Sequence, residues 1–172
     1  MVNKLREASI SVGVAVHVWA QIPTSALIFS PALIDYCKTN VCGCYNKSWT
    51  CPPACASIEE QQKILSFQNV LVFTTKHDLE DSFDYDGMTK GRQRHTLLTA
   101  EIKNMLGDVL VYGAGNCPVC ANCSFPEPCL FPEKQIGSIE AAGIDVTELS
   151  KAAGVAYNNG ENTVTFFTMV VR

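Results

Sequence analysis

The stretch DVLVYGAGNCPVCANCSFPEPC, residues 108–129, decides how the fold of this chain is predicted. It begins with a short apolar segment, Asp108–Tyr112, which predicts a buried strand. Two glycines then lead directly into four cysteines with the spacing C-x2-C-x2-C-x5-C, namely Cys117, Cys120, Cys123 and Cys129. We expect a loop that leaves the carboxyl end of a strand, which is where ligand sites form in open α/β sheets.

The segments before this stretch predict a strand followed by a helix. Val70–Thr75 consists of Val, Leu, Phe and Thr, which is typical of a buried strand. Lys90–Leu106 places its apolar residues on one helical face, and Gly107 predicts the end of that helix. With Asp108–Tyr112 as the next strand, this order predicts a right-handed parallel crossover.

The N-terminal part of the chain predicts two further extended segments and a helix. Ile10–Ala20 alternates apolar residues with small or polar ones, and a period of two predicts a half-buried strand. Ser25–Ser30 predicts a second extended piece that Pro31 closes. Ser57 and Glu60 have the spacing of a capping box, which predicts a helix that runs to about residue 67.

The C-terminal part predicts one more helix and one more strand. Asp145 and Glu148 form a second capping pair, and Gly154 predicts the end of the helix they begin. Thr163–Val171 is rich in aromatic and β-branched residues and predicts a closing strand. Together these elements predict one cysteine-rich α/β domain over residues 1–172, with a mixed sheet of four to five strands, about three helices and two metal-binding loops.

A second group of cysteines lies far upstream of the first-quoted stretch. It falls in a segment rich in Gly, Asn and Pro, which predicts a loop, and consists of Cys37, Cys42, Cys44, Cys51 and Cys55. The nine cysteines are odd in number and closely spaced within each group. Cysteines so close in sequence bridge each other only with strain but converge readily on a metal, so we favour metal ligation over structural disulfides.

The two groups predict related but different centres. Four thiols spaced as in Cys117–Cys129 are typical of a [4Fe–4S] cube, with zinc as the main rival and a thiol cluster without metal as a third possibility. In the upstream group, five thiols exceed the four corners of a cube, so one is spare, reactive or exchangeable. We expect a cluster there too, with zinc or a redox-active thiol pair as alternatives; the spacing does not choose between Cys44 and Cys55 as ligand.

Three ordered motifs carry a resemblance to a known family. Residues 37–53 resemble a "C…C…YGKxWxCPP" segment, residues 117–129 resemble a C-x2-C-x2-C motif followed by Pro and Cys, and residues 138–146 resemble "SxEAxGIDV". The chain is similar in these respects to an uncharacterised family of small, cysteine-rich, predicted metal-binding and iron–sulfur proteins of methanogenic archaea and anaerobic bacteria. The resemblance implies metal binding and no particular reaction.

The resemblance also implies a set of ligands and some departures. The family ligands would be Cys37, Cys42, Cys51, Cys117, Cys120, Cys123 and Cys129. Cys44 and Cys55 are additional cysteines, Asn46 stands where the family usually has Gly, and Leu130 stands where a basic residue is common. Seven thiols imply one complete cluster and one site with a ligand that is exchangeable or is not a cysteine.

Composition narrows the expected partners and compartment. The net charge of −4 makes nucleic acid an unexpected partner, and the basic stretch at Lys90, Arg92 and Arg94 is too short to change this. Lys90–Arg92, near a helix start, has the charges for an anion site, but we favour a solvated face. No apolar run is long enough for a membrane span, so we expect no membrane contact. Because the alternation of Ile10–Ala20 is unlike a signal peptide, we expect a cytoplasmic protein.

The expected function is therefore that of an iron–sulfur protein with one or two [4Fe–4S] clusters. It would transfer electrons, or serve as a redox accessory to an anaerobic enzyme, with a partner protein on the receiving side. The alternatives are a zinc-binding structural or metal-handling module and an enzyme whose cluster has an open site. No nucleotide-binding, acyl-transfer or zinc-protease motif is present, and the sequence leaves open whether the chain is an enzyme.

Overall fold

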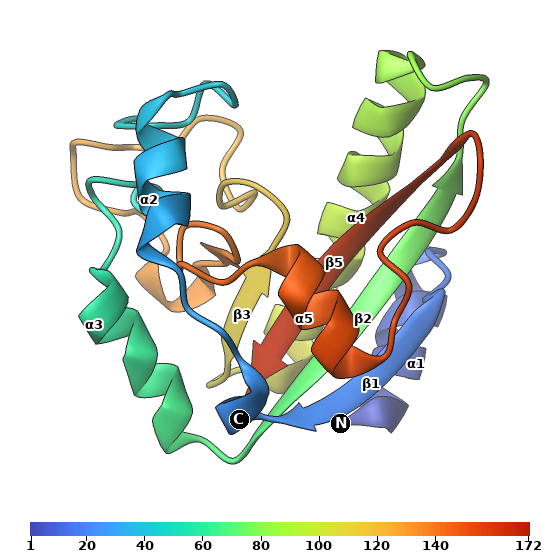
Figure 1. Cartoon of the computed structure of the whole chain (residues 1–172), viewed down its shortest axis with the longest axis horizontal. Coiled ribbons are helices and arrows are strands. Elements are labelled where there is room, and N and C mark those ends of the chain that lie inside the picture. The colour runs from blue at the N-terminus through green and yellow to red at the C-terminus, as the bar shows by residue number, and fades with distance from the viewer.

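Five strands form one mixed sheet in the order β1-β2-β5-β3-β4 (Figure 1). The structure is a computed structural model that describes all of residues 1–172. The strands are β1 (Val18–Pro23), β2 (Asn69–Asp78), β3 (Leu110–Gly113), β4 (Gly137–Ser138) and β5 (Thr163–Val171). All neighbouring pairs are antiparallel except β3 and β4, which are parallel.

Five α-helices accompany the sheet: α1 (Val2–Val12), α2 (Pro31–Lys38), α3 (Ile58–Gln61), α4 (Tyr85–Leu106) and α5 (Val146–Ala153). Three short 3₁₀ turns lie at Thr24–Ala26, Gln62–Ser66 and Pro132–Lys134. The predicted α/β class is thus confirmed. The five strands agree with the four to five predicted, and the five α-helices are two more than the three predicted. No helix is both long and apolar enough to cross a membrane.

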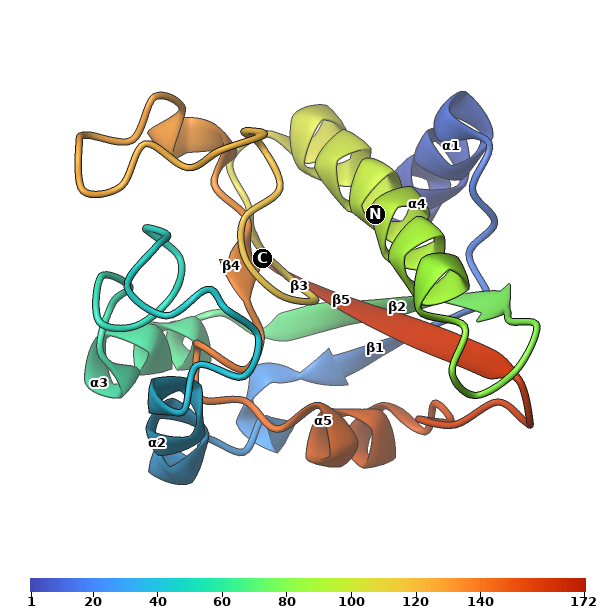
Figure 2. The ribbon, with the colours of Figure 1, turned by 90° about the horizontal axis from the view of Figure 1, so that it is seen from above.

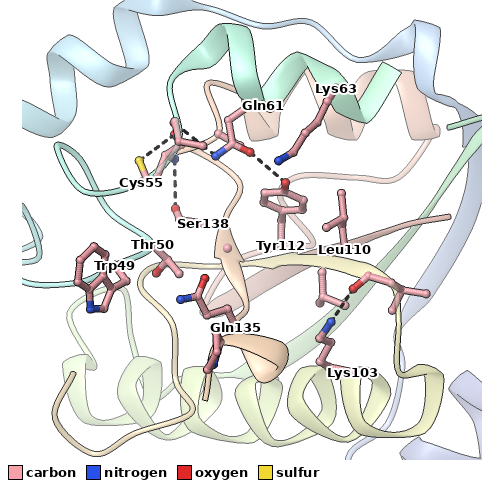
Figure 3. Close-up of a pocket in the computed structure, with 17 residues that line it drawn as sticks. Trp49, Thr50, Cys55, Gln61, Lys63, Lys103, Leu110, Tyr112, Gln135 and Ser138 are labelled. Atoms are coloured by element: carbon pink, nitrogen blue, oxygen red, sulfur yellow. Dashed lines mark hydrogen bonds between the residues drawn. The ribbon is translucent and has the colours of Figure 1, made fainter. Parts of the chain in front are cut away.

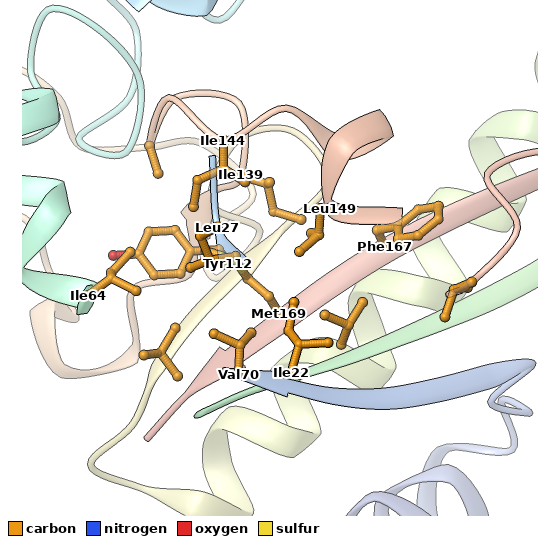
Figure 4. Packing of buried hydrophobic residues seen from close by; sticks show 14 residues of the cluster. Ile22, Leu27, Ile64, Val70, Tyr112, Ile139, Ile144, Leu149, Phe167 and Met169 are labelled. Atoms are coloured by element: carbon orange, nitrogen blue, oxygen red, sulfur yellow. The ribbon is translucent and has the colours of Figure 1, made fainter. Parts of the chain in front are cut away.

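Helices cover both faces of the sheet, with α1 and α4 on one face and α5 on the other (Figure 2). Strand β2 is buried on both faces because its side chains alternate between the two cores. Leu71 and Phe73 pack toward α1 and α4, whereas Val70 and Val72 join the core beneath α5 (Figure 4). This explains the uninterrupted apolar run by which β2 is recognised in the sequence.

Most of the long predicted elements are confirmed. The predicted strands near residues 70–75, 108–112 and 163–171 are β2, β3 and β5, and the predicted helix before Gly107 is α4. Helix α4 begins earlier than expected, at Tyr85, because the carboxylate of Asp84 accepts a hydrogen bond from the backbone N–H of Gly87 at 2.7 Å. The capping box of Ser57 and Glu60 is present, although α3 soon tightens into a 3₁₀ turn.

The predicted strand at Ile10–Ala20 is wrong except for Val18–Ala20, which begin β1. Helix α1 runs to Val12, and Gly13 ends it in a left-handed conformation with φ 66°. The buried side chains of α1 are those of Leu5 and Ala8, which lie three residues apart on one face, and they pack against α4. Burial at helical spacing therefore outweighs the alternation that begins downstream, and only the last residues of the segment enter β1.

The segment around Pro31 also differs from expectation. Ser25–Ser30 is not extended throughout, since it begins within a 3₁₀ turn and makes only an isolated bridge between Phe29 and Ile144. Pro31 opens helix α2 instead of closing a strand, because a proline at the first helical position gives up no internal hydrogen bond. As a result, Cys37 lies in the last turn of a helix and not in the predicted loop.

The predicted crossover joins strands that are parallel but not adjacent. Helix α4 connects β2 to β3, and both of these strands are antiparallel to β5, which lies between them. In a simple crossover β2 and β3 would be neighbours, but here the C-terminal strand β5 lies between them. The consequence for function is that β3 and β4 are at one edge, where the chain leaves β3 toward the second cysteine group.

A buried polar chain joins α4 to the sheet. His95 is 2% exposed, and its Nδ1 and Nε2 lie 2.9 Å from Thr75 Oγ1 and 2.8 Å from Thr168 Oγ1. Thr168 continues to the hydroxyl of Thr99, which donates to the backbone carbonyl of His95 at 3.0 Å. Burial lowers the pKa of His95 to about 4, so this side chain is neutral in the folded protein near pH 7.

This burial predicts a loss of stability in mild acid. In the unfolded chain a histidine takes up a proton near pH 6.5, whereas folded His95 does so only near pH 4. The free energy of unfolding should therefore fall by up to about 3 kcal/mol as the pH drops from about 6.5 to about 4, and this contribution should level off below. Urea unfolding of the wild type across this range measures the effect.

Two variants isolate the contribution of His95. In His95→Gln the fall between pH 7 and pH 4 should be smaller than in the wild type, whereas His17→Gln, which changes an exposed histidine, should follow the wild type. An equal pH dependence in the wild type and His95→Gln would contradict the assignment.

Candidate metal centre

The two cysteine groups lie side by side, beyond the end of the sheet to which β3 points (Figure 1). The upstream group begins with Cys37 in α2 and continues through the loop that precedes α3. The downstream group follows β3 directly, because Gly113 ends the strand and Cys117 is only four residues further on.

The segment Ser48–Thr50 joins the two groups. The hydroxyl of Thr50 accepts a hydrogen bond from the backbone N–H of Cys117 at 3.0 Å and lies 3.2 Å from that of Ser48. The indole N–H of Trp49 donates to the backbone carbonyl of Glu127 at 2.9 Å, and its ring meets that of Phe125 edge to face, with centroids 5.1 Å apart. These contacts fix the two loops against each other, and those of Ser48 and Thr50 are buried.

The upstream group surrounds an open cavity of about 370 Å³. Four of its five thiols line this cavity: Cys37, Cys42, Cys44 and Cys51. Cys55 does not line it, and its thiol lies 3.8 Å from the backbone carbonyl oxygen of Ala141. The structure therefore places Cys44 among the thiols that face one another, a point that the spacing leaves open.

The environment of these thiols favours their protonated form in the absence of a metal. Burial and, after it, the neighbouring thiols, with Cys44 first among them, together raise the pKa of Cys51 to about 12. Burial also raises the pKa of Cys37 and of Cys44. At Cys44 the positive charges of Arg92 and Lys47 act in the opposite direction and lower the pKa.

The downstream group surrounds a much smaller space. Its four thiols, those of Cys117, Cys120, Cys123 and Cys129, line a cavity of about 20 Å³ together with Ser48, Trp49 and Thr50 of the bridging segment. A space of this size admits a body of about one water molecule. A cube would therefore require the downstream loop to open, whereas the upstream cavity is already wide enough for a group of several atoms.

Backbone amides face two of the downstream thiols. Burial raises the pKa of Cys117, and the N–H groups of Ile136 and Val119 oppose this by hydrogen bonding. At Cys123 burial also acts to raise the pKa, but the backbone N–H groups of Phe125, Trp49 and others outweigh it, so the pKa is lowered overall. Amide donors that stabilise thiolates are a means by which proteins tune metal–thiolate centres.

The thiols share cavities without forming a closed ligand sphere. No group of three or more Cys, His, Asp or Glu side chains is arranged so that it could hold a metal ion. The donor chemistry nevertheless fits the implied centres, because sets of four thiolates are what zinc and iron–sulfur clusters take. Any bound centre would be held by Cys37, Cys42, Cys44 and Cys51, or by Cys117, Cys120, Cys123 and Cys129.

A third cavity, of about 240 Å³, is lined by Trp49 and Thr50 of the bridging segment and by Cys55 (Figure 3). On its inner wall the hydroxyl of Tyr112 donates to Gln61 Oε1 at 3.0 Å, and burial raises the pKa of this phenol to about 12. The neighbouring strand β4 passes close to the Tyr112 ring at Gly137, where a Cβ atom would lie only 2.5 Å from Cδ1. Glycine is therefore required for the β3–β4 contact that forms this wall.

Sequence analysis does not identify the bridging residues Ser48 and Thr50 as part of the site. Their only signal is that they alternate with Trp49 and Cys51 inside a cysteine motif. Glu140, from the Ser138–Val146 motif, also lines the upstream cavity, where its carboxylate accepts a hydrogen bond from the hydroxyl of Ser138 at 2.9 Å. The cavity thus contains one acidic and one basic side chain, Glu140 and Arg92.

These environments predict different thiol reactivities in reduced protein without metal. Because the thiolate is the reactive form, iodoacetamide at pH 8 should modify Cys123 at least about tenfold faster than Cys51. Mass spectrometry of peptides at successive times measures the two rates. In urea the difference should disappear, and equal rates in the folded protein would contradict the assigned environments.

Comparison with known proteins gives one match, to a family model. The model of the family "Predicted metal-binding protein (DUF2284)" matches residues 20–171. No curated protein and no solved structure matches the chain significantly. The match begins within β1, includes all nine cysteines and ends at the last residue of β5. The chain therefore belongs to the predicted metal-binding protein family DUF2284.

Proposed function

We propose that this protein is an iron–sulfur protein that binds one or two [4Fe–4S] clusters and transfers electrons or supports a redox enzyme. The observation that carries the proposal is the arrangement of eight thiols as two adjacent sets of four, each around one cavity. Membership of a predicted metal-binding family supports the metal-binding part. The choice of iron and sulfide over zinc rests on the C-x2-C-x2-C spacing of the downstream group and on the width of the upstream cavity.

The downstream group supports a cube through its sequence, and its loop would open to take one up. Its C-x2-C-x2-C spacing is typical of ferredoxin-like loops, and a fourth cysteine follows between prolines. The amides that face Cys117 and Cys123 would donate hydrogen bonds to the sulfurs of a bound cluster and so help to set its potential.

In the upstream group, the proposed ligands are Cys37, Cys42, Cys44 and Cys51. The width of the cavity supports a centre of several atoms here, because a structural zinc ion is enclosed directly by its four ligands. The same width favours a second candidate function, an enzyme in which a substrate reaches an iron with an open position. In that case one of the four thiols, or Cys55, would be exchangeable.

The setting of such a protein follows from the same chemistry. Nine free thiols are typical of a reducing compartment, so we propose a cytoplasmic protein. We also propose an anaerobic cell, because oxygen damages iron–sulfur clusters that solvent can reach. Exposed apolar residues flank both groups, with Val41 77% and Leu130 66% exposed. They support a protein redox partner that docks beside the clusters, since apolar contacts at the centre of an interface exclude water.

Metal and sulfide content tests the proposal. Protein purified without oxygen should contain about eight iron and eight acid-labile sulfide per chain if both clusters are present, with absorbance that dithionite bleaches. About four of each would assign a single cube, for which the downstream group is the first candidate. Zinc without sulfide would overturn the proposal and leave a structural or metal-handling module.

Single substitutions assign the ligands. Cys120→Ser should lower the iron content by about four per chain, and Cys44→Ser should do the same if the upstream cluster is present. Cys55→Ser is the matched control, because this thiol lies outside both sets of four, and it should retain all the iron. The reverse result, iron lost in Cys55→Ser and kept in Cys44→Ser, would overturn the proposed upstream ligand set.

A further inference from the structure

The wall of the upstream cavity carries a cation without a partner, close enough to Cys44 to lower the pKa of that thiol. Arg92 of α4 lines the cavity, and its guanidinium makes no ion pair and no hydrogen bond within the chain. Its Nη1 lies over the backbone at Gly115, 3.5 Å from the position that a Cβ atom would take there. Gly115 adopts a left-handed conformation with φ 80°, which glycine takes up without strain, and the guanidinium lies at ordinary contact distance from it.

Free backbone donors lie beside this guanidinium. The N–H groups of Ala114, Gly115 and Asn116 have no hydrogen-bond acceptor within the chain, whereas the next one, that of Cys117, donates to Thr50. Gly115 and Asn116 line the same cavity as Arg92. Successive free N–H groups next to a guanidinium form a setting that attracts an anion.

The rest of the cavity wall favours an organic anion with one negative group over inorganic phosphate. Apolar and aromatic side chains also line the cavity, namely Tyr36, Val41, Tyr45, Pro52 and Ala141. Such a wall favours a hydrocarbon body and gives inorganic phosphate few partners. The carboxylate of Glu140 lies in the same cavity, so a second negative group on the ligand would be repelled.

We propose that the upstream cavity is a binding site for a small organic monocarboxylate, whose carboxylate is held by Arg92 and the backbone N–H groups of Gly115 and Asn116. Its body lies against the apolar wall and faces the thiols. The inference deepens the proposed function, because it rests on that function for a redox centre beside the ligand. The contacts that hold the anion come from residues other than the cysteines, so binding does not itself require a particular metal.

Benzoate serves as the probe because it joins one carboxylate to an apolar body. Isothermal titration of protein purified without oxygen should give saturable binding of benzoate, with at least about tenfold weaker binding of its neutral counterpart benzamide and of inorganic phosphate. Arg92→Gln should weaken benzoate binding at least about tenfold, and Arg92→Lys should fall between, because lysine keeps the charge but lacks the planar fork.

Lys90→Gln is the matched control for charge. It removes one positive charge from the same helix at a residue that does not line the cavity, so benzoate affinity should stay within about twofold of the wild type. Benzoate binding that is absent, that is equal in Arg92→Gln and wild type, or that is matched by benzamide would overturn the inference. A higher affinity for phosphate than for benzoate would contradict the assignment of the ligand as an organic carboxylate.

Iron and sulfide analysis of the same samples separates this inference from the proposed function. Benzoate binding that depends on Arg92 in protein without iron would support the anion site and contradict the clusters. Protein with its full iron and no benzoate binding would contradict the anion site alone.

Discussion

The hydrogen bond from the backbone N–H of Cys117 to the hydroxyl of Thr50 is the contact on which the rest of the site depends. It joins a loop that follows β3 to a loop that precedes α3, and these two loops carry all the cysteines except Cys37. Because Ser48 and Thr50 are buried, loss of this contact would leave polar groups unpaired in the interior. The position of one cysteine group therefore depends on that of the other.

Much of the fold is predictable because its longest elements have clear periods. Strand β2 reads as a continuous apolar run, and α4 has apolar residues at helical spacing followed by Gly107. The short helices are harder, since α2 has eight residues and α3 four, too few for a period to be recognised. At the N-terminus two periods compete, and only the contacts of Leu5 and Ala8 with α4 decide for the helix.

The site is predictable in its residue types but not in its geometry. Spacing identifies the nine cysteines and places the downstream group at the carboxyl end of β3. The choice between Cys44 and Cys55 depends on which way each side chain turns within one loop, and no periodicity encodes that. The presence of Arg92 is harder still to predict, because it reaches the cavity from α4, a helix that lies between the two cysteine groups in the sequence and belongs to neither motif.

The charges around the upstream cavity suggest why a basic residue belongs there. Buried thiols that face one another resist ionisation, as the raised pKa values of Cys51, Cys44 and Cys37 indicate. A metal centre must displace these protons, so its binding is coupled to proton release and to the local potential. Arg92 and Lys47 supply positive charge next to Cys44, which lowers the free energy required to ionise that thiol. The same guanidinium can both favour assembly of a thiolate centre and attract an anionic ligand to it, because each role requires only an unpaired positive charge at the edge of the cavity.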